Sequence, residues 1–68
     1  MMAQTGMVRR WGKRGYGFIR ADDGADFFAH VSQVVPRQKH LMREGLRVEF
    51  AVGKDREGKP RAVVVRAI

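Results

Sequence analysis

Residues 14–21 read Arg14-Gly15-Tyr16-Gly17-Phe18-Ile19-Arg20-Ala21, and their alternation decides the fold. Side chains of a β-strand point to opposite faces in turn, so one face carries both aromatic and both arginine side chains. The other face carries the two glycines, Ile19 and Ala21. Burying the first face would take two guanidinium groups out of water, at a cost of several kcal/mol each unless they are paired. We therefore expect Ile19 and Ala21 to face the core, and both rings to face solvent, although strand aromatics are more often buried.

A second strand is predicted over residues 25–31. It follows Asp22-Asp23-Gly24, and an Asp-Gly pair supplies the positive φ of a tight hairpin turn, so the two strands should be antiparallel neighbours. Phe27, Ala29 and Val31 form its more apolar face and are predicted to join the core. Phe28 and His30 then extend the exposed aromatic surface of the first strand.

Three further strands are predicted over residues 5–11, 46–52 and 60–67. In residues 46–52 the even positions are apolar and are expected to face the core. Residues 32–45 contain Pro36 and several basic residues and are predicted to form a loop, in which Ser32 could cap a single helical turn and no longer helix is expected. Five short strands with one long connection predict an all-β fold, a closed five-stranded antiparallel barrel, because closure removes exposed strand edges.

The two glycines of the quoted stretch are interpreted as positions that allow strand curvature and close packing across a narrow barrel. A turn or bulge is the alternative for each. With 68 residues the chain has room for one domain, predicted over 1–68 with residues 1–4 flexible. No cysteine, signal peptide or membrane-spanning run is present in the sequence, so we expect a soluble protein of the cytoplasm.

The charge of the chain predicts a polyanionic partner. Lys and Arg total 14 against 7 Asp and Glu, a formal net charge of +7. Every nucleobase offers a π face, and stacking on an aromatic side chain is worth about 1–3 kcal/mol per base. Exposed rings among basic residues therefore predict binding of unpaired RNA or DNA, with phosphates held by Lys and Arg.

Two segments of the sequence resemble the paired ribonucleoprotein motifs of the cold-shock domain family. They are Arg14-Gly15-Tyr16-Gly17-Phe18-Ile19 and, after it, Asp26-Phe27-Phe28-Ala29-His30. The resemblance runs from about Gly6 to Ala67. It implies an oligonucleotide/oligosaccharide-binding (OB) barrel that binds single-stranded nucleic acid. It also implies that Tyr16, Phe18, Phe28 and His30 stack bases, in agreement with the face inferred from alternation.

The sequence departs from that family after Val8. The family usually has a tryptophan two residues later, where Arg10 stands here, and Trp11 comes next. Either a bulge lets Trp11 serve as the first stacking residue, which we favour, or Trp11 replaces the adjacent aromatic and Arg10 makes a cation–π or phosphate contact. Fewer aromatic and more basic residues should increase the reliance on phosphate contacts.

The predicted binding residues combine the aromatic side chains with the basic residues around them. Arg37, Lys39 and His40 are included because they partly compensate for an aromatic of the family's long loop, and Arg61 because it stands where the family often has glutamine. The full set is Arg9, Arg10, Trp11, Lys13, Arg14, Tyr16, Phe18, Arg20, Phe28, His30, Arg37, Lys39, His40 and Arg61.

Neither an enzyme nor a metal or cofactor site is predicted. His30 and His40 lack a neighbouring cysteine or carboxylate cluster at ligand spacing, and the few hydroxyl side chains form no triad. We expect a monomer that binds single-stranded RNA or DNA rather than a membrane or a small-molecule substrate, and that acts as an RNA chaperone or as a regulator of transcription or translation. The alternative is an SH3-like barrel whose exposed aromatics grip an extended peptide.

Overall fold

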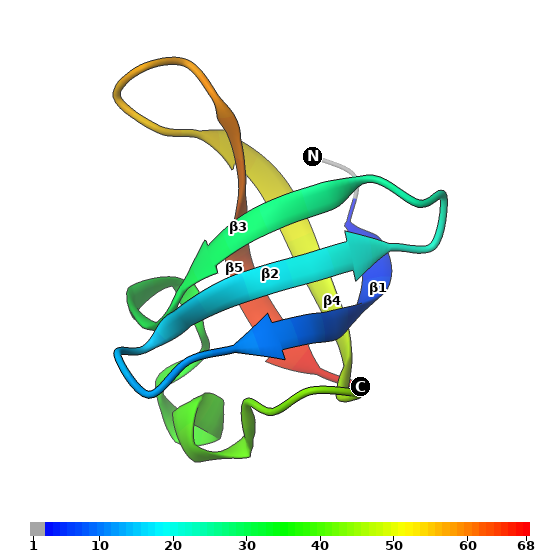
Figure 1. Cartoon of the computed structure of the whole chain (residues 1–68), viewed down its shortest axis with the longest axis vertical. Coiled ribbons are helices and arrows are strands. Elements are labelled where there is room, and N and C mark those ends of the chain that lie inside the picture. The colour runs from blue at the N-terminus through cyan, green and yellow to red at the C-terminus, as the bar shows by residue number, and fades with distance from the viewer. Residues whose placement is uncertain (1–2) are drawn as a thin grey trace.

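The computed structural model describes residues 3–68, and within them five strands close into a barrel (Figure 1). The strands are β1 (Gln4–Trp11), β2 (Tyr16–Ala21), β3 (Asp26–His30), β4 (Arg47–Lys54) and β5 (Pro60–Ala67). They follow one another around the barrel in the order β1-β2-β3-β5-β4. All pairings are antiparallel except a short parallel contact between β3 and β5. The prediction of an all-β, five-stranded barrel is confirmed.

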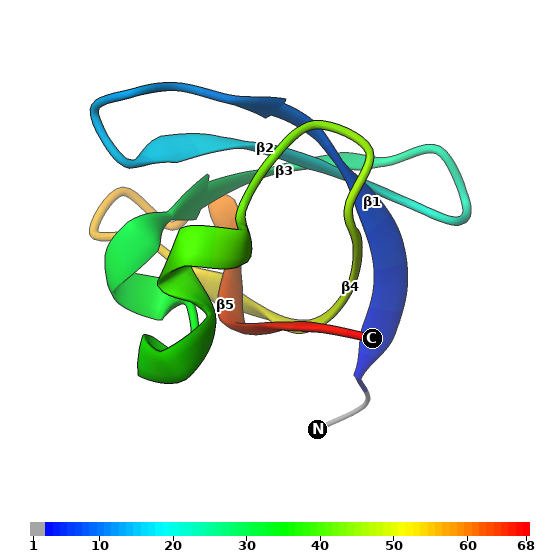
Figure 2. The ribbon, with the colours of Figure 1, turned by 90° about the horizontal axis from the view of Figure 1, so that it is seen from below.

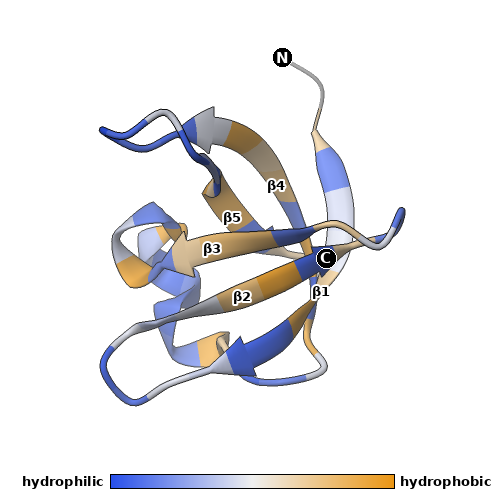
Figure 3. Ribbon diagram, turned by 45° about the horizontal axis from the view of Figure 1, so that its top comes forward, coloured by the Kyte–Doolittle hydropathy of each residue, from blue (hydrophilic) through white to orange (hydrophobic). Residues whose placement is uncertain are grey.

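Alternation places the core as the sequence predicts. Ile19 and Ala21 are buried, and Val48 and Phe50 supply the buried even positions of β4. The ring of Phe27 packs on that of Phe50 with centroids 5.5 Å apart. In Figure 3 hydrophobic colours mark parts of β2, β3, β4 and β5, whereas the end of β1 and the β4–β5 turn are hydrophilic.

The hairpin between β2 and β3 is also confirmed, but the two glycines before and within β2 have different roles. Gly15 has φ +85° and lies in the turn that precedes β2, so the turn alternative holds there and curvature is the wrong explanation. Gly17 lies in β2 opposite Trp11, and a Cβ built on it would overlap the carbonyl oxygen of Arg10. Close packing of β1 on β2 therefore requires a glycine at position 17.

The connection between β3 and β4 differs from the predicted loop. It forms two 3₁₀ helices, η1 (Val31–Gln33) and η2 (Pro36–Leu41), which lie at one end of the barrel (Figure 2). Pro36 suits the start of η2 because its φ is already helical and its missing N–H needs no partner there. Buried Val34 and Met42 fix both ends of η2 to the core.

The first residues of the chain were predicted to be flexible. Gln4 already belongs to β1, while Met1 and Met2 of the predicted flexible segment lie outside the described residues. No helix within residues 3–68 is both long and apolar enough to cross a membrane.

Acid should destabilise the barrel through Asp22, which joins three strands at one end. Its carboxylate accepts hydrogen bonds from Arg47 of β4, at 2.9 and 3.4 Å, and from the Thr5 hydroxyl of β1. These bonds, led by the one from Arg47, hold the pKa of Asp22 below its ordinary value of 3.8. The folded form therefore binds this proton less readily than the unfolded form.

The stabilisation is thus present above the ordinary pKa and is lost as the pH falls through the lower pKa of the folded state. Urea unfolding followed from neutral pH to about pH 2 should show this loss as a declining free energy of unfolding. An Asp22→Asn variant should decline less steeply, because the amide does not titrate. An identical pH profile for the two proteins would contradict the assignment.

Candidate nucleic-acid interface

Four side chains form a continuous surface on the outside of β2 and β3, which we call the aromatic face: Tyr16, Phe18, Phe28 and His30. Cross-strand pairing sets Tyr16 beside His30 and Phe18 beside Phe28. The Phe28 ring centroid lies 5.8 Å from that of Tyr16 and 5.9 Å from that of Phe18. Tyr16 is 41% exposed and Phe18 43% exposed, while Phe28 and His30 are half-buried. The predicted outward placement of these side chains is confirmed.

Arginines stand at both ends of the phenylalanine pair. Arg10 of β1 is the partner of Phe18, and Arg61 of β5 is the partner of Phe28 across the parallel contact. Directly paired residues point to the same side of a sheet, so β1, β2, β3 and β5 together present a row that reads Arg, Phe, Phe, Arg. Arg61 is half-buried, and its Nε is buried without a hydrogen-bond partner among the described residues. This row places a π surface between two cationic groups.

Trp11 lies on the other side of β1. A bulge does occur in this strand, between Val8 and Arg10, as one interpretation of the sequence required. The extra residue shifts the alternation by one position, so Arg10 turns outward and Trp11 turns inward, opposite Gly17 and packed against the core. The structure thus places Arg10, and not Trp11, beside Phe18.

Two of the predicted arginines are held by an acidic residue. Asp26 accepts hydrogen bonds from the Nε and Nη2 atoms of Arg20 at 3.0 and 3.3 Å, and Arg9 Nη1 lies 3.5 Å from the same carboxylate. Arg9, Arg10, Phe18 and Asp26 surround a hollow of about 260 Å³ beside the aromatic face. Asp26 was not among the predicted residues, although its alternation with Phe28 and His30 already placed it on their face.

The other predicted cations fall into two groups. Lys13 and Arg14 lie on the β1–β2 turn and, with Arg10, Tyr16 and Phe18, line a hollow of about 330 Å³. Both are exposed and form no ion pair among the described residues. Arg37, Lys39 and His40 lie instead on η2, which packs against β5, and not on the strands that carry the aromatic face.

His30 is held in a defined orientation by the start of η1. Its Nδ1 accepts a hydrogen bond from the backbone N–H of Ser32 at 3.1 Å and lies 2.9 Å from the Ser32 hydroxyl. Because Nδ1 acts as the acceptor, the neutral ring carries its proton on Nε2. His30, and not Ser32, therefore caps this helical turn. The His-x-Ser spacing was the available signal for this contact.

Comparison with known proteins identifies the family. Residues 4–68 match the family model described as the 'Cold-shock' DNA-binding domain. The chain belongs to the cold-shock domain family. A cold shock-like protein of Thermotoga maritima is 38% identical to this cold-shock domain over 56 residues, which cover 82% of the chain and 83% of the relative.

Two other relatives extend the comparison. A probable cold shock protein A of Mycolicibacterium smegmatis is 39% identical over 57 residues, covering 82% of this cold-shock domain and 84% of the relative. Cold shock protein 1 of Arabidopsis thaliana is 42% identical over 55 residues, covering 79% of the chain but only 18% of that longer protein. These matches confirm the resemblance seen in the ribonucleoprotein motifs. The cold-shock domain is a nucleic-acid-binding and non-enzymatic family. The SH3-like alternative therefore loses its basis.

Proposed function

We propose that this chain binds unpaired stretches of RNA or DNA, with low sequence preference, by stacking bases on the aromatic face. The row of Arg10, Phe18, Phe28 and Arg61 is the observation that carries the proposal. A base stacked on the ring of Phe18 or of Phe28 has a guanidinium group beside it for its phosphates. The π face of a ring accepts any base, which accounts for low sequence preference.

The exposed cations of the β1–β2 turn extend this surface. Lys13 and Arg14 border the hollow beside Tyr16 and are available for phosphates. The proton on Nε2 of a neutral His30 makes this side chain a hydrogen-bond donor for a base or a phosphate. Trp11 is left out of the proposed stacking set, while Arg37, Lys39 and His40 of η2 are proposed to contact flanking phosphates.

Binding the unpaired form in preference to the paired form shifts secondary structure toward open strands, without ATP. The proposal therefore includes an RNA-chaperone role, or a role as a regulator of transcription or translation. It also keeps the monomeric state and the cytoplasmic location that the sequence predicts.

Binding of labelled oligothymidylate should weaken as salt increases, with a slope of log K against log salt of about −0.7 for each phosphate neutralised. Replacing Lys13 and Arg14 by glutamine should make this slope less negative by about 1.4, since two phosphate contacts are lost. Fluorescence anisotropy at graded salt concentrations measures both values.

Arg56→Gln with Lys59→Gln is the matched control, because it removes two cations from the β4–β5 turn at another corner of the barrel (Figure 1). This control should change the slope less than the pair on the β1–β2 turn. Absence of salt-sensitive binding by the unaltered protein would contradict the proposed function, as would equal affinity for the same sequence as a duplex.

A further inference from the structure

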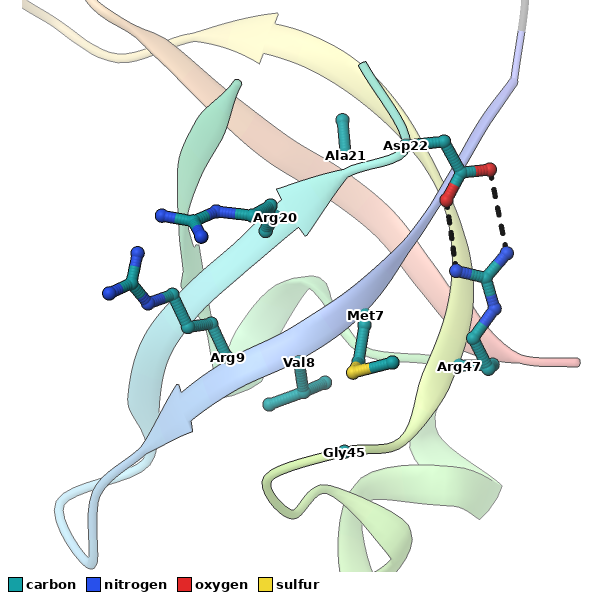
Figure 4. Close-up of a pocket in the computed structure, with 8 residues that line it drawn as sticks. All are labelled: Met7, Val8, Arg9, Arg20, Ala21, Asp22, Gly45 and Arg47. Atoms are coloured by element: carbon teal, nitrogen blue, oxygen red, sulfur yellow. Dashed lines mark hydrogen bonds and ion pairs between the residues drawn. The ribbon is translucent and has the colours of Figure 1, made fainter. Parts of the chain in front are cut away.

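The aromatic face contains two cross-strand rows, one through Tyr16 and His30 and the next through Phe18 and Phe28. A third row of side chains lies beyond them on the same side of the sheet. Met7 of β1 is paired with Arg20 of β2 on one side and with Arg47 of β4 on the other. Its side chain is 44% exposed although it is apolar. Met7 lines a hollow of about 390 Å³. Figure 4 shows Met7 between the arginines of β1 and β2 and the Arg47–Asp22 pair. None of the predicted functions uses Met7 or Arg47.

The spacing of this row continues that of the aromatic face. Tyr16 and Phe18 are two residues apart on β2, and Arg20 follows after two more. Two residues of a strand span about 6.7 Å, so the three rows are evenly spaced on the outer surface. A nucleic acid strand that sets successive bases on the first two rows reaches the third row with its next base.

The two arginines beside Met7 are fixed by carboxylates. Asp26 holds Arg20 through two hydrogen bonds, and Asp22 holds Arg47 through two more. Each guanidinium edge is thereby occupied and partly neutralised, which weakens it as a phosphate contact. Its planar face remains available, and bases stack on guanidinium planes as they do on aromatic rings. The polarisable thioether of methionine also makes favourable contacts with aromatic rings.

We infer that Met7, Arg20 and Arg47 form a base-binding site for the nucleotide that follows the stretch bound to the aromatic face. This inference rests on the proposed function, because the strand must first occupy Phe18 and Phe28. Two features select this occupant: the site is continuous with the aromatic face through Arg20 and Asp26, and its lining is cationic on balance. At Met7 the lining is apolar and exposed, which suits a base better than a phosphate.

A series of oligothymidylates that grows by one nucleotide at a time tests the site. Affinity of the unaltered protein should rise with length to a plateau. A Met7→Ala variant should bind the shortest oligonucleotides as the unaltered protein does, and the plateau oligonucleotides about five- to tenfold more weakly. Met7→Phe should strengthen binding of the plateau oligonucleotides alone. Val64→Ala, which trims a still more exposed apolar side chain on β5 outside the three rows, is the control and should change neither.

The outcomes separate this site from the aromatic face. A loss that is the same at every length would overturn the inference, since Met7 would then act on the aromatic face or on the fold. No loss at any length, with Met7→Phe equally silent, would overturn it as well. If the unaltered protein bound none of the oligonucleotides, the proposed function itself would fail, and the inference with it.

Discussion

Replacing Phe18 by alanine is expected to weaken oligonucleotide binding by about five- to 150-fold and to leave the barrel folded. The ring is 43% exposed and forms a T-shaped pair with the ring of Phe28, at 76° between planes. Its removal takes away a stacking surface worth about 1–3 kcal/mol to a bound base but little of the core. Fluorescence anisotropy with a labelled oligothymidylate gives the loss of affinity, and thermal unfolding gives the stability.

Phe50→Ala is the matched control for this prediction. The same side chain is lost, but Phe50 is only 1% exposed and packs on Phe27 inside the barrel. Truncating a buried phenylalanine costs about 3–5 kcal/mol, so this variant should be largely unfolded in so small a domain. If Phe18→Ala unfolded the protein as Phe50→Ala does, the assignment of the outer face would be wrong.

The barrel itself could be predicted because each strand carries its own evidence about which face is buried. Alternation in residues 46–52 points Val48 and Phe50 inward, and the cost of burying Arg14 and Arg20 turns Ile19 inward. Local turn chemistry then pairs β2 with β3. The structure places strand boundaries within about two residues of the predictions, as expected where terminal pairing depends on neighbouring strands.

The sequence of β1 allows a bulge, but it does not fix which side chains the bulge turns outward. Arg9 and Arg10 are both acceptable on the outside, so the alternation can slip by one residue without burying a charge. After the slip, the backbone of Arg10 and Trp11 lies close to Gly17, a contact between segments that the sequence does not reveal. The inward position of Trp11 follows directly from this single extra residue.

Neighbours from other strands also decide which cations belong to the site. The aromatic face was predictable from one hairpin, but Arg9 and Arg20 are held by Asp26 only because three strands meet there. In the same way, Met7 lies between two arginines through pairings with β2 and β4. In η2, 3₁₀ hydrogen bonds organise a segment whose composition indicated only a loop.

Gly17→Ala is expected to destabilise the barrel by about 3 kcal/mol or more, the upper range for overpacking a tight site. The new Cβ would overlap the carbonyl oxygen of Arg10 and lie 2.9 Å from the Cα of Trp11. These are backbone atoms, so no side chain can rotate away, and relief requires β1 to separate from β2. A small domain has little stability in reserve, so much of the population should be unfolded in urea titrations near room temperature.

Gly12→Ala in the same hairpin separates this clash from the general cost of replacing a glycine. A Cβ on Gly12 meets only the carbonyl oxygen of Tyr16, at an ordinary 3.5 Å. The free energy of unfolding of this variant should therefore lie within about 0.5 kcal/mol of that of the unaltered protein. Equal stability of the two variants would mean that β1 does not approach Gly17 so closely. The pairing of Arg10 with Phe18, which places one of the two arginines beside the phenylalanine pair, would then be wrong.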